Sequence, residues 1–358
     1  MKLKTVKKFF FFYVLLTATS LSFDIDLKDI DQSSFKHFTT YANSKYKEKK
    51  IKKYINYFSN TKKGRSFYRE AYPRQGMFET IIKKVFDEYD IPEDLKYVAM
   101  IESGFNSNAE SSAGAIGLWQ FMPSTGKIFG LRIDEWIDER KDIQKSTLAA
   151  AQYFNSLKRK FGTWELVLAG YNSGDLTVER AIKQYKSKDY WHLSQYTFPK
   201  QTREFVPQIL AVIIISKNLN EYGFDDLKLN NSIDIEEVVV PPRTRLNHIA
   251  RLVNLDRELL SRLNPSILKR ITPPDGDYVI NVPKGYKEKI YAKFKINVDN
   301  KNLYRYKIRE GDTLSGIALK FSNSIDEIYT LNNLTSSRIY AGDFILVYKR
   351  TNRYKKIE

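Results

Sequence analysis

Cysteine is absent from the 358-residue sequence. Its absence excludes disulfide bonds, thiolate catalysis and zinc sites built from cysteine. It also argues against a lipid anchor on a cysteine behind a signal peptide. Histidine is nearly as scarce, since His37, His192 and His248 are its only occurrences and lie far apart in the sequence. The sequence therefore disfavours a metalloenzyme or a histidine-dependent triad, and we predict no metal site and no cofactor.

Long hydrophobic runs are also missing. The apolar runs at residues 9–16 and 209–215 are both shorter than the ~20 residues that a transmembrane helix needs. Lysines precede the first run and small residues follow it, which is typical of a secretory signal peptide. We therefore predict a signal peptide over residues 1–22, with an uncleaved anchor as the alternative. The second run predicts a buried core helix.

Positive charge is in excess, with 59 Lys and Arg against 42 Asp and Glu and a net charge of +17. A basic surface suits an anionic partner such as nucleic acid, membrane lipid or an acidic polymer. The lysines are spread along the chain without a long basic block, so a general lysine enrichment explains them equally well. No nucleic-acid-binding motif accompanies the charge, and we expect no nucleic-acid partner.

A carboxylate interrupts the apolar face of one predicted helix, which covers residues 92–103 and ends at Gly104. Four residues of this helix share one face at spacings i, i+3, i+4 and i+7: Leu95, Val98, Ala99 and Glu102. Burial and the helix dipole in the last turn both disfavour a charged Glu102. A raised pKa is what a general acid requires, whereas the plainer alternative is a glutamate that reaches solvent.

The chain divides into segments of different character. Residues 23–75 predict a small helical leader, and residues 76–222 predict a mostly α-helical domain followed by a polar linker. Beyond the linker, residues 234–285 and 304–348 form a weak internal repeat. Each repeat unit is predicted to contain a strand, two helices and a second strand. Five positions match between the units: Leu246, Ile249, Ala250, Leu263 and Asn264 with Leu314, Ile317, Ala318, Leu331 and Asn332.

Several ordered motifs resemble a known family. The segments VAMIESGFNSNAESSAGAIGLWQFMPSTG (98–126), LAGYNSG (168–174) and QTREFVPQIL (201–210) resemble the lytic murein transglycosylases, most closely the membrane-bound D type. The segment from residue 306 to residue 348 resembles a LysM peptidoglycan-binding module, and residues 234–285 resemble its degenerate form. The resemblance implies a mainly α lysozyme-like catalytic domain of the goose-lysozyme type, followed by two small α+β modules.

The resemblance also assigns roles to individual positions. It implies that Glu102 is the catalytic acid and base. The residues that match the family's glycan cleft are Ser111, Gln120, Met122, Tyr171 and Asn172. Those implied to bind glycan in the LysM module are Gly311, Asp312, Thr313 and Asn332, although Asp312 and Thr313 also suit a helix cap. The chain departs from the family where Gln201 replaces a glutamate and Phe205 replaces a tyrosine, so Tyr171 or another donor would have to hold the catalytic carboxyl.

A single matched carboxylate suits a reaction without a water nucleophile, because hydrolytic glycosidases usually carry two. We therefore expect cleavage between N-acetylmuramic acid and N-acetylglucosamine with formation of a 1,6-anhydro product. The alternatives are a lysozyme-like hydrolase and a peptidoglycan-binding scaffold without activity. The resemblance implies peptidoglycan glycan strands as the partner, and we expect a monomer. The predicted signal peptide and the missing cysteine predict a location in the periplasm or cell envelope without a lipid anchor.

Overall fold

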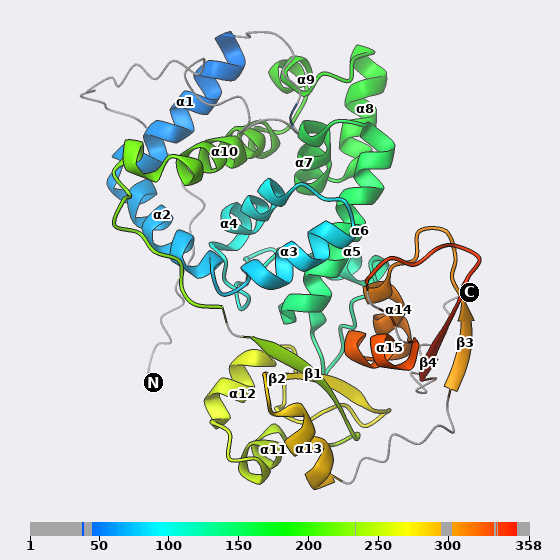
Figure 1. Cartoon of the computed structure of the whole chain (residues 1–358). Helices are drawn as coiled ribbons and strands as arrows, with labels where there is room; N and C mark the ends of the chain where they lie inside the picture. The colour runs from blue at the N-terminus through cyan, green and yellow to red at the C-terminus, as the bar shows by residue number, and fades with distance from the viewer. Residues whose placement is uncertain are drawn as a thin grey trace, which may run out of the picture.

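The computed structural model describes residues 38, 45–294 and 303–348, apart from residues 233, 333 and 335. The predicted signal peptide and most of residues 23–44 lie outside this part of the chain. A large helical domain is followed by two small modules, each with a two-stranded sheet and helices (Figure 1). This order confirms the predicted fold class, a mainly α domain followed by two α+β modules.

Two helices precede the domain that carries the matched motifs, α1 (Lys45–Asn60) and α2 (Lys62–Gln75). Helix α1 docks on α10 (Lys200–Lys217) through the carboxylate of Glu204, which accepts hydrogen bonds from Lys50 (2.5 Å), Lys53 (2.7 Å) and Tyr54 (2.7 Å). Burial alone would raise the pKa of Glu204, but these three donors outweigh it and lower the pKa to about 2. The leader is thereby fixed to the large domain.

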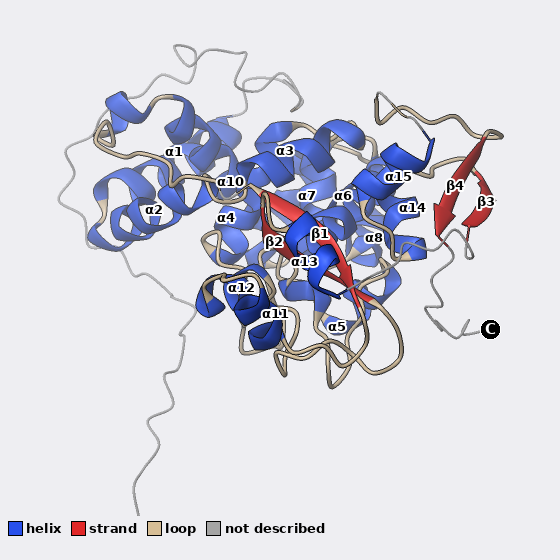
Figure 2. Cartoon of the chain, turned by 60° about the horizontal axis from the view of Figure 1, so that its bottom comes forward, coloured by secondary structure: helices blue, strands red, loops and turns tan. Residues whose placement is uncertain are grey.

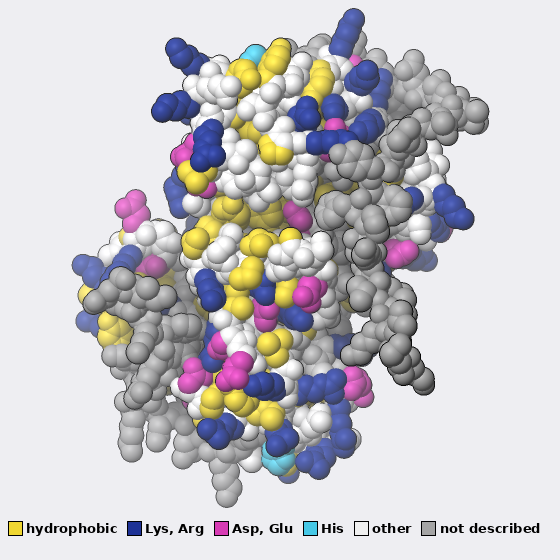
Figure 3. All heavy atoms as spheres, turned by 180° about the vertical axis from the view of Figure 1, so that it is seen from behind, with side chains coloured by type: hydrophobic (Ala, Val, Ile, Leu, Met, Phe, Trp, Pro, Cys, Tyr) yellow, Lys and Arg dark blue, Asp and Glu magenta, His cyan; other side chains and the backbone are white. Residues whose placement is uncertain are grey.

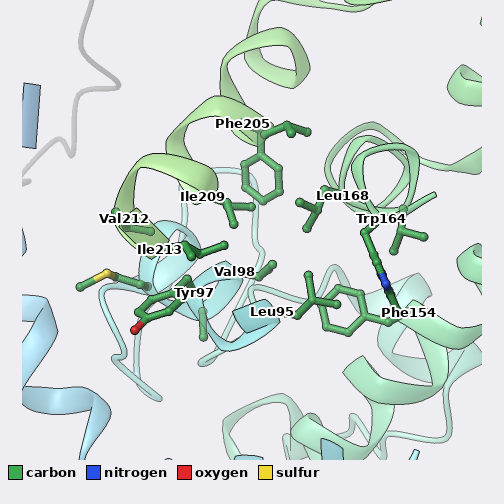
Figure 4. Packing of buried hydrophobic residues seen from close by; sticks show 14 of the residues in the cluster. Leu95, Tyr97, Val98, Phe154, Trp164, Leu168, Phe205, Ile209, Val212 and Ile213 are labelled. Atoms are coloured by element: carbon green, nitrogen blue, oxygen red, sulfur yellow. The ribbon is translucent and has the colours of Figure 1, made fainter. Parts of the chain in front are cut away.

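The large domain is built almost entirely from helices. Besides α10, they are α3 (Glu79–Glu88), α4 (Tyr97–Ser103), α5 (Pro123–Ile128), α6 (Ile143–Phe161), α7 (Trp164–Ser173), α8 (Asp175–Tyr185), α9 (Tyr190–Tyr196) and the 3-10 turns η2 (Glu93–Lys96), η3 (Glu139–Lys141) and η4 (Leu219–Tyr222). Residues 209–215 of α10 are fully buried, which confirms the predicted core helix. Figure 4 shows their packing against Leu95 and Val98 on one side and Leu168 on another. Within the described residues, no helix has the length and apolarity needed to cross a membrane.

The predicted helix over residues 92–103 is divided. Residues 93–96 form the 3-10 turn η2, and the α-helix α4 begins only at Tyr97. Such a turn is common at the start of a helix, and here it follows the extended backbone of Pro92. Gly104 ends the helix in the left-handed conformation with φ +61°, as the sequence predicted.

The two C-terminal modules share one topology. The first contains β1 (Ile235–Val240), α11 (Leu246–Leu252), α12 (Arg257–Leu263) and β2 (Tyr278–Pro283), followed by α13 (Lys287–Phe294). The second contains β3 (Leu303–Lys307), α14 (Leu314–Phe321), α15 (Ile325–Asn332) and β4 (Phe344–Tyr348). Both sheets are antiparallel, with Val240 opposite Tyr278 and Lys307 opposite Phe344 (Figure 2). The predicted strand–helix–helix–strand order is therefore confirmed in both repeats; α13 was not predicted.

Candidate active site and glycan-binding residues

Glu102 lies in the last turn of α4, above a buried apolar surface. Leu95, Val98 and Ala99, which share its face, are fully buried, and Glu102 itself is partly buried. Burial raises the pKa of the Glu102 carboxyl to about 8. Within the described residues, no hydrogen bond or ion pair to this carboxyl is present. The carboxyl is therefore protonated at neutral pH, as the helix pattern predicted.

Ser103, the next residue, connects the end of α4 to the loop that follows. Its hydroxyl lies 2.9 Å from the carbonyl oxygen of Ala99 and 2.8 Å from that of Leu118. It also accepts a hydrogen bond of 3.2 Å from the backbone N–H of Asn106. This hydroxyl therefore holds the loop against the turn that carries Glu102.

The loop over residues 109–122 contains three of the predicted glycan ligands. The Gln120 amide donates to the carbonyls of Gly117 (2.9 Å) and Ala109 (3.2 Å), and Gln120 has a left-handed backbone with φ +51°. The Ser111 hydroxyl accepts the N–H of Ala115 at 3.0 Å. Met122, in contrast, is 41% exposed. Ser111 and Gln120 thus shape the loop, while Met122 is exposed and its role in glycan binding stays a prediction.

Arg140 holds this loop at two points, Gly114 and Phe121, although no sequence pattern indicated this residue. Its guanidinium is buried and pairs with Asp138 through bonds of 2.9 and 2.7 Å. The same group donates to the carbonyls of Gly114 (2.8 Å) and Phe121 (3.1 Å). Gly114 and Phe121 lie 26 and 19 positions before Arg140 in the sequence. Only the folded chain therefore shows that Arg140 organises this loop.

Tyr171 and Asn172 come from the end of α7. The Tyr171 hydroxyl donates to the carbonyl of Trp119 at 2.6 Å. Burial, and next the charge of nearby Glu102, raise the pKa of Tyr171 well above its usual value. Tyr171 therefore donates to Trp119 and not to Glu102 in this structure, and the donor expected to hold the catalytic carboxyl stays a prediction. Asn172 accepts a hydrogen bond of 3.0 Å from Thr202, which joins α7 to α10.

Tyr171→Phe tests whether this hydroxyl orders the loop. We expect a loss of about 1 kcal/mol in unfolding free energy, because the Trp119 carbonyl loses its donor. We also expect cleavage of peptidoglycan to slow by about an order of magnitude as the loop that Tyr171 holds at Trp119 loosens. Thermal unfolding and sacculus digestion measure the two effects. If neither changes, the Tyr171–Trp119 bond has no part in organising the site.

The two departures from the family lie in different surroundings. Gln201 is exposed at the start of α10, whereas Phe205 is 4% exposed and its ring points into the apolar cluster beside Leu168 (Figure 4). A phenyl ring offers no hydroxyl to Glu102. The raised pKa of Glu102 therefore depends on burial.

Four other acids between residues 94 and 139 have structural roles or face solvent. Asp94 pairs with Lys217 at 2.9 Å, and Asp138 pairs with Arg140. Glu139 is buried and bonds Lys145 at 2.6 Å and the Tyr278 hydroxyl at 2.9 Å, while Glu110 is exposed. Among the described residues there is also no cluster of three His, Asp or Glu that could hold a metal ion. Glu102 is thus the candidate for acid and base chemistry.

Several of the residues predicted to bind glycan in the second module form hydrogen bonds within the module. Gly311 has φ +81°, and the Asp312 carboxylate accepts from the Tyr306 hydroxyl (2.8 Å) and the Arg309 N–H (2.7 Å). Thr313 caps α14 by accepting the N–H of Gly316 at 3.1 Å, which confirms the capping alternative.

Asn332 connects α15 to β4. Its amide donates to the carbonyls of Ile328 and Leu346 at 2.8 Å each and accepts the N–H of Leu346 at 2.7 Å. Asn264, the matching residue in the first repeat, likewise donates to Leu260 and Asn281 and accepts from Asn281. The repeated asparagine therefore has a structural role in both modules.

Asn332→Ala is expected to destabilise the second module by about 2 kcal/mol, because it leaves two carbonyls and one N–H without their partner. Asn264→Ala should destabilise the first module similarly. Asn247→Ala, on the exposed side of α11, is the matched control and should have little effect. Urea unfolding monitored by NMR measures the unfolding midpoint of each module separately. An unchanged midpoint for Asn332→Ala would contradict the structural role.

Comparison with known proteins agrees with this architecture. Residues 79–194 match the family described as Transglycosylase SLT domain, residues 234–295 the Lytic transglycosylase MltD, LysM-like domain, and residues 306–347 the LysM domain. The chain therefore carries a match to an SLT domain followed by two matches of the LysM type, in the order in which the structure places the large domain and the two modules.

The chain is also similar to a curated enzyme of the D type. The chain is 30% identical over 275 residues to membrane-bound lytic murein transglycosylase D of Escherichia coli, a match that covers 72% of this chain and 60% of that protein. It thus spans about 60% of the length of this curated relative. Among solved structures, an inactive mutant of lytic transglycosylase Slt from Pseudomonas aeruginosa has 24% identity and a TM-score of 0.33, covering 39% of this chain and 24% of that chain. The 70 kDa soluble lytic transglycosylase of Escherichia coli has 17% identity and a TM-score of 0.36, covering 47% and 33%.

Proposed function

We propose that this protein is a lytic transglycosylase that cleaves the β-1,4 bond between N-acetylmuramic acid and N-acetylglucosamine in peptidoglycan and leaves 1,6-anhydro ends. The observation that carries the proposal is the partly buried Glu102, whose pKa is raised to about 8 on the apolar face of α4. The SLT domain match, which includes this residue, supports the same reaction class.

One residue performs both proton transfers in this mechanism. Protonated Glu102 donates its proton to the glycosidic oxygen, and the bond from C1 of the muramic residue to that oxygen breaks. The 2-acetamido group of the substrate can stabilise the developing positive charge. Ionised Glu102 then removes the proton from the C6 hydroxyl, whose oxygen bonds to C1. The carboxyl is restored, and no water is consumed.

The surroundings of Glu102 favour this reaction over hydrolysis. A hydrolase needs a second carboxylate to activate water or to act as nucleophile. The acids considered above are paired with Lys or Arg or exposed, and burial is what raises the pKa of Glu102. The C6 hydroxyl, held by the substrate itself, replaces the water.

The LysM module supports a polymeric substrate. A second weak binding site on the same chain raises the local concentration of glycan at the first. The net charge of +17 favours anionic envelope surfaces. The predicted signal peptide over residues 1–22 and the membrane-bound D-type relative support a location in the cell envelope.

Mass spectrometry of muropeptides tests the proposal. Protein without residues 1–22 is incubated with intact sacculi beside a Glu102→Gln control. Anhydro products that are absent from the control are expected. Reducing ends would instead identify a muramidase. No release by the unmutated protein, with sacculus binding intact, would leave a wall-binding scaffold.

A further inference from the structure

The second module is held against the large domain at the start of α14. The Glu88 carboxylate, at the end of α3, accepts the backbone N–H of Ser315 at 2.9 Å and also the Ser315 hydroxyl. The next residue, Tyr89, forms a hydrogen bond of 2.6 Å with the hydroxyl of Thr313. Gln152 of α6 donates to the same Tyr89 oxygen at 3.3 Å. Figure 1 shows the resulting arrangement of the second module: α14 lies beside the large domain, and β3 and β4 lie on the far side.

These contacts are chemically matched. A carboxylate at a helix N-terminus satisfies free N–H groups and interacts favourably with the helix dipole. The backbone approaches closely as well, because a Cβ added to Gly316 would lie 3.5 Å from the Tyr89 oxygen. Ser315 and Tyr89 are both buried in this contact.

A second contact involves the first module. Glu237 of β1 accepts the N–H of Ile325 at 3.4 Å, at the start of α15, and Lys287 lies 3.8 Å from Asp326. Carboxylates from two different domains therefore reach the N-termini of both helices of the second module. A cavity of about 150 Å³ remains where the three domains meet, so the junction is incompletely packed.

The residues of the second module that contact the large domain, Thr313 and Ser315, overlap the predicted glycan site. The Thr313 hydroxyl already accepts the N–H of Gly316 and pairs with Tyr89, and Ser315 beside it is covered by Glu88. A glycan that reached the Thr313 hydroxyl would have to displace Tyr89. The two contacts therefore exclude each other at this edge.

We propose that a glycan strand and the large domain compete for the Thr313–Ser315 edge of the second module. The structure is then a closed form, held by Glu88 and Tyr89, and glycan binding at the module opens it. This inference rests on the proposed function in taking peptidoglycan glycan as the competing ligand. Closure lowers the apparent affinity of the module by the fraction of molecules that are open, so weakening the contact should raise that affinity.

Two variants in a Glu102→Gln background test the competition, because that background binds glycan without cleaving it. The double variant Glu88→Ala with Tyr89→Phe is expected to bind N-acetylglucosamine oligomers about 5-fold more tightly or better. Asp87→Ala, on the exposed side of the same helix, is the matched control and should leave the affinity unchanged. Equal affinity of the double variant and the control would overturn the competition.

Opening itself is measurable because the chain has no native cysteine. Spin labels at Lys83→Cys and Lys307→Cys, both exposed and away from the contact, report the separation of α3 and β3. Addition of the oligomers should lengthen the distance between the two labels, measured by double electron–electron resonance. The double variant Glu88→Ala with Tyr89→Phe should show the longer distance without glycan. An unchanged distance at saturating glycan, or no glycan binding at all, would overturn the proposal. Release of anhydro products by the unmutated protein is a separate readout, so failure of the closed form and failure of the proposed function are distinguishable.

Discussion

Glu102→Gln is expected to lower the rate of glycan cleavage by at least about a thousandfold, because general acid and base catalysis of this kind contributes ~10²–10⁴. The amide can neither donate a proton to the glycosidic oxygen nor remove one from the C6 hydroxyl. Two other buried acids are paired elsewhere, since Asp138 pairs with Arg140 and Glu139 with Lys145. Binding to sacculi should persist, because the variant keeps the shape of the side chain. Residual cleavage above a hundredth of the original rate would contradict a catalytic role for Glu102.

The same residue determines the expected pH dependence. The pKa of Glu102 is raised by burial to about 8, so the acid form predominates below that pH. We expect kcat/KM to fall as pH rises through about 8, because the free enzyme loses the proton that it must donate. Initial rates on soluble glycan chains between pH 5 and 10 measure this. A basic limb at the ordinary pKa of a glutamate would show that burial does not protect the proton.

Glu102→Gln should raise the stability of the protein at alkaline pH although it removes the activity. The folded protein holds the Glu102 proton more strongly than the unfolded chain, whose carboxyl titrates near 4.5. The unmutated protein therefore loses stability as pH rises from about 4.5 to about 8, whereas Glu102→Gln does not. At pH 8 the variant should be more stable by about 2 kcal/mol, allowing for the partial exposure of the site. Glu110→Gln, an exposed carboxyl, is the control, and an equal gain there would contradict this interpretation.

Local patterns were enough to predict the central residue. The spacing of Leu95, Val98, Ala99 and Glu102 placed the carboxyl on an apolar face, and the structure confirms that face. The matching asparagines 264 and 332 likewise followed from the internal repeat, although their structural role required the strand partners. A repeat and a helical period are both properties of neighbouring residues, which is why the sequence could show them.

Long-range contacts account for what the sequence did not show. Tyr171 donates to Trp119, and Glu88 meets Ser315 across 227 positions of the chain. Neither pairing has a signal in local spacing, since each depends on how separate helices pack. Local spacing is therefore enough to predict the carboxyl of Glu102, whereas the conformation of the loop over residues 109–122 depends on contacts between separate helices.

Substitution of Arg140 should cause the largest loss of stability among the variants that affect the loop over residues 109–122. Arg140→Met is expected to destabilise the protein by about 3–5 kcal/mol, because it leaves Asp138 charged and buried without its partner. The carbonyls of Gly114 and Phe121 lose their donor at the same time. Urea unfolding measures the loss, and Lys141→Met, the neighbouring cation, is the matched control.

A second variant separates the charge from the loop. Arg140→Met with Asp138→Leu removes the unpaired charge and should recover much of the stability, since a buried ion pair is often replaceable by apolar residues. It does not restore the bonds to Gly114 and Phe121. Cleavage should therefore remain low in the stabilised double variant, because the loop that carries Gln120 still lacks its bonds to residue 140. Full recovery of both stability and cleavage would show that Arg140 only neutralises Asp138 and does not position the loop.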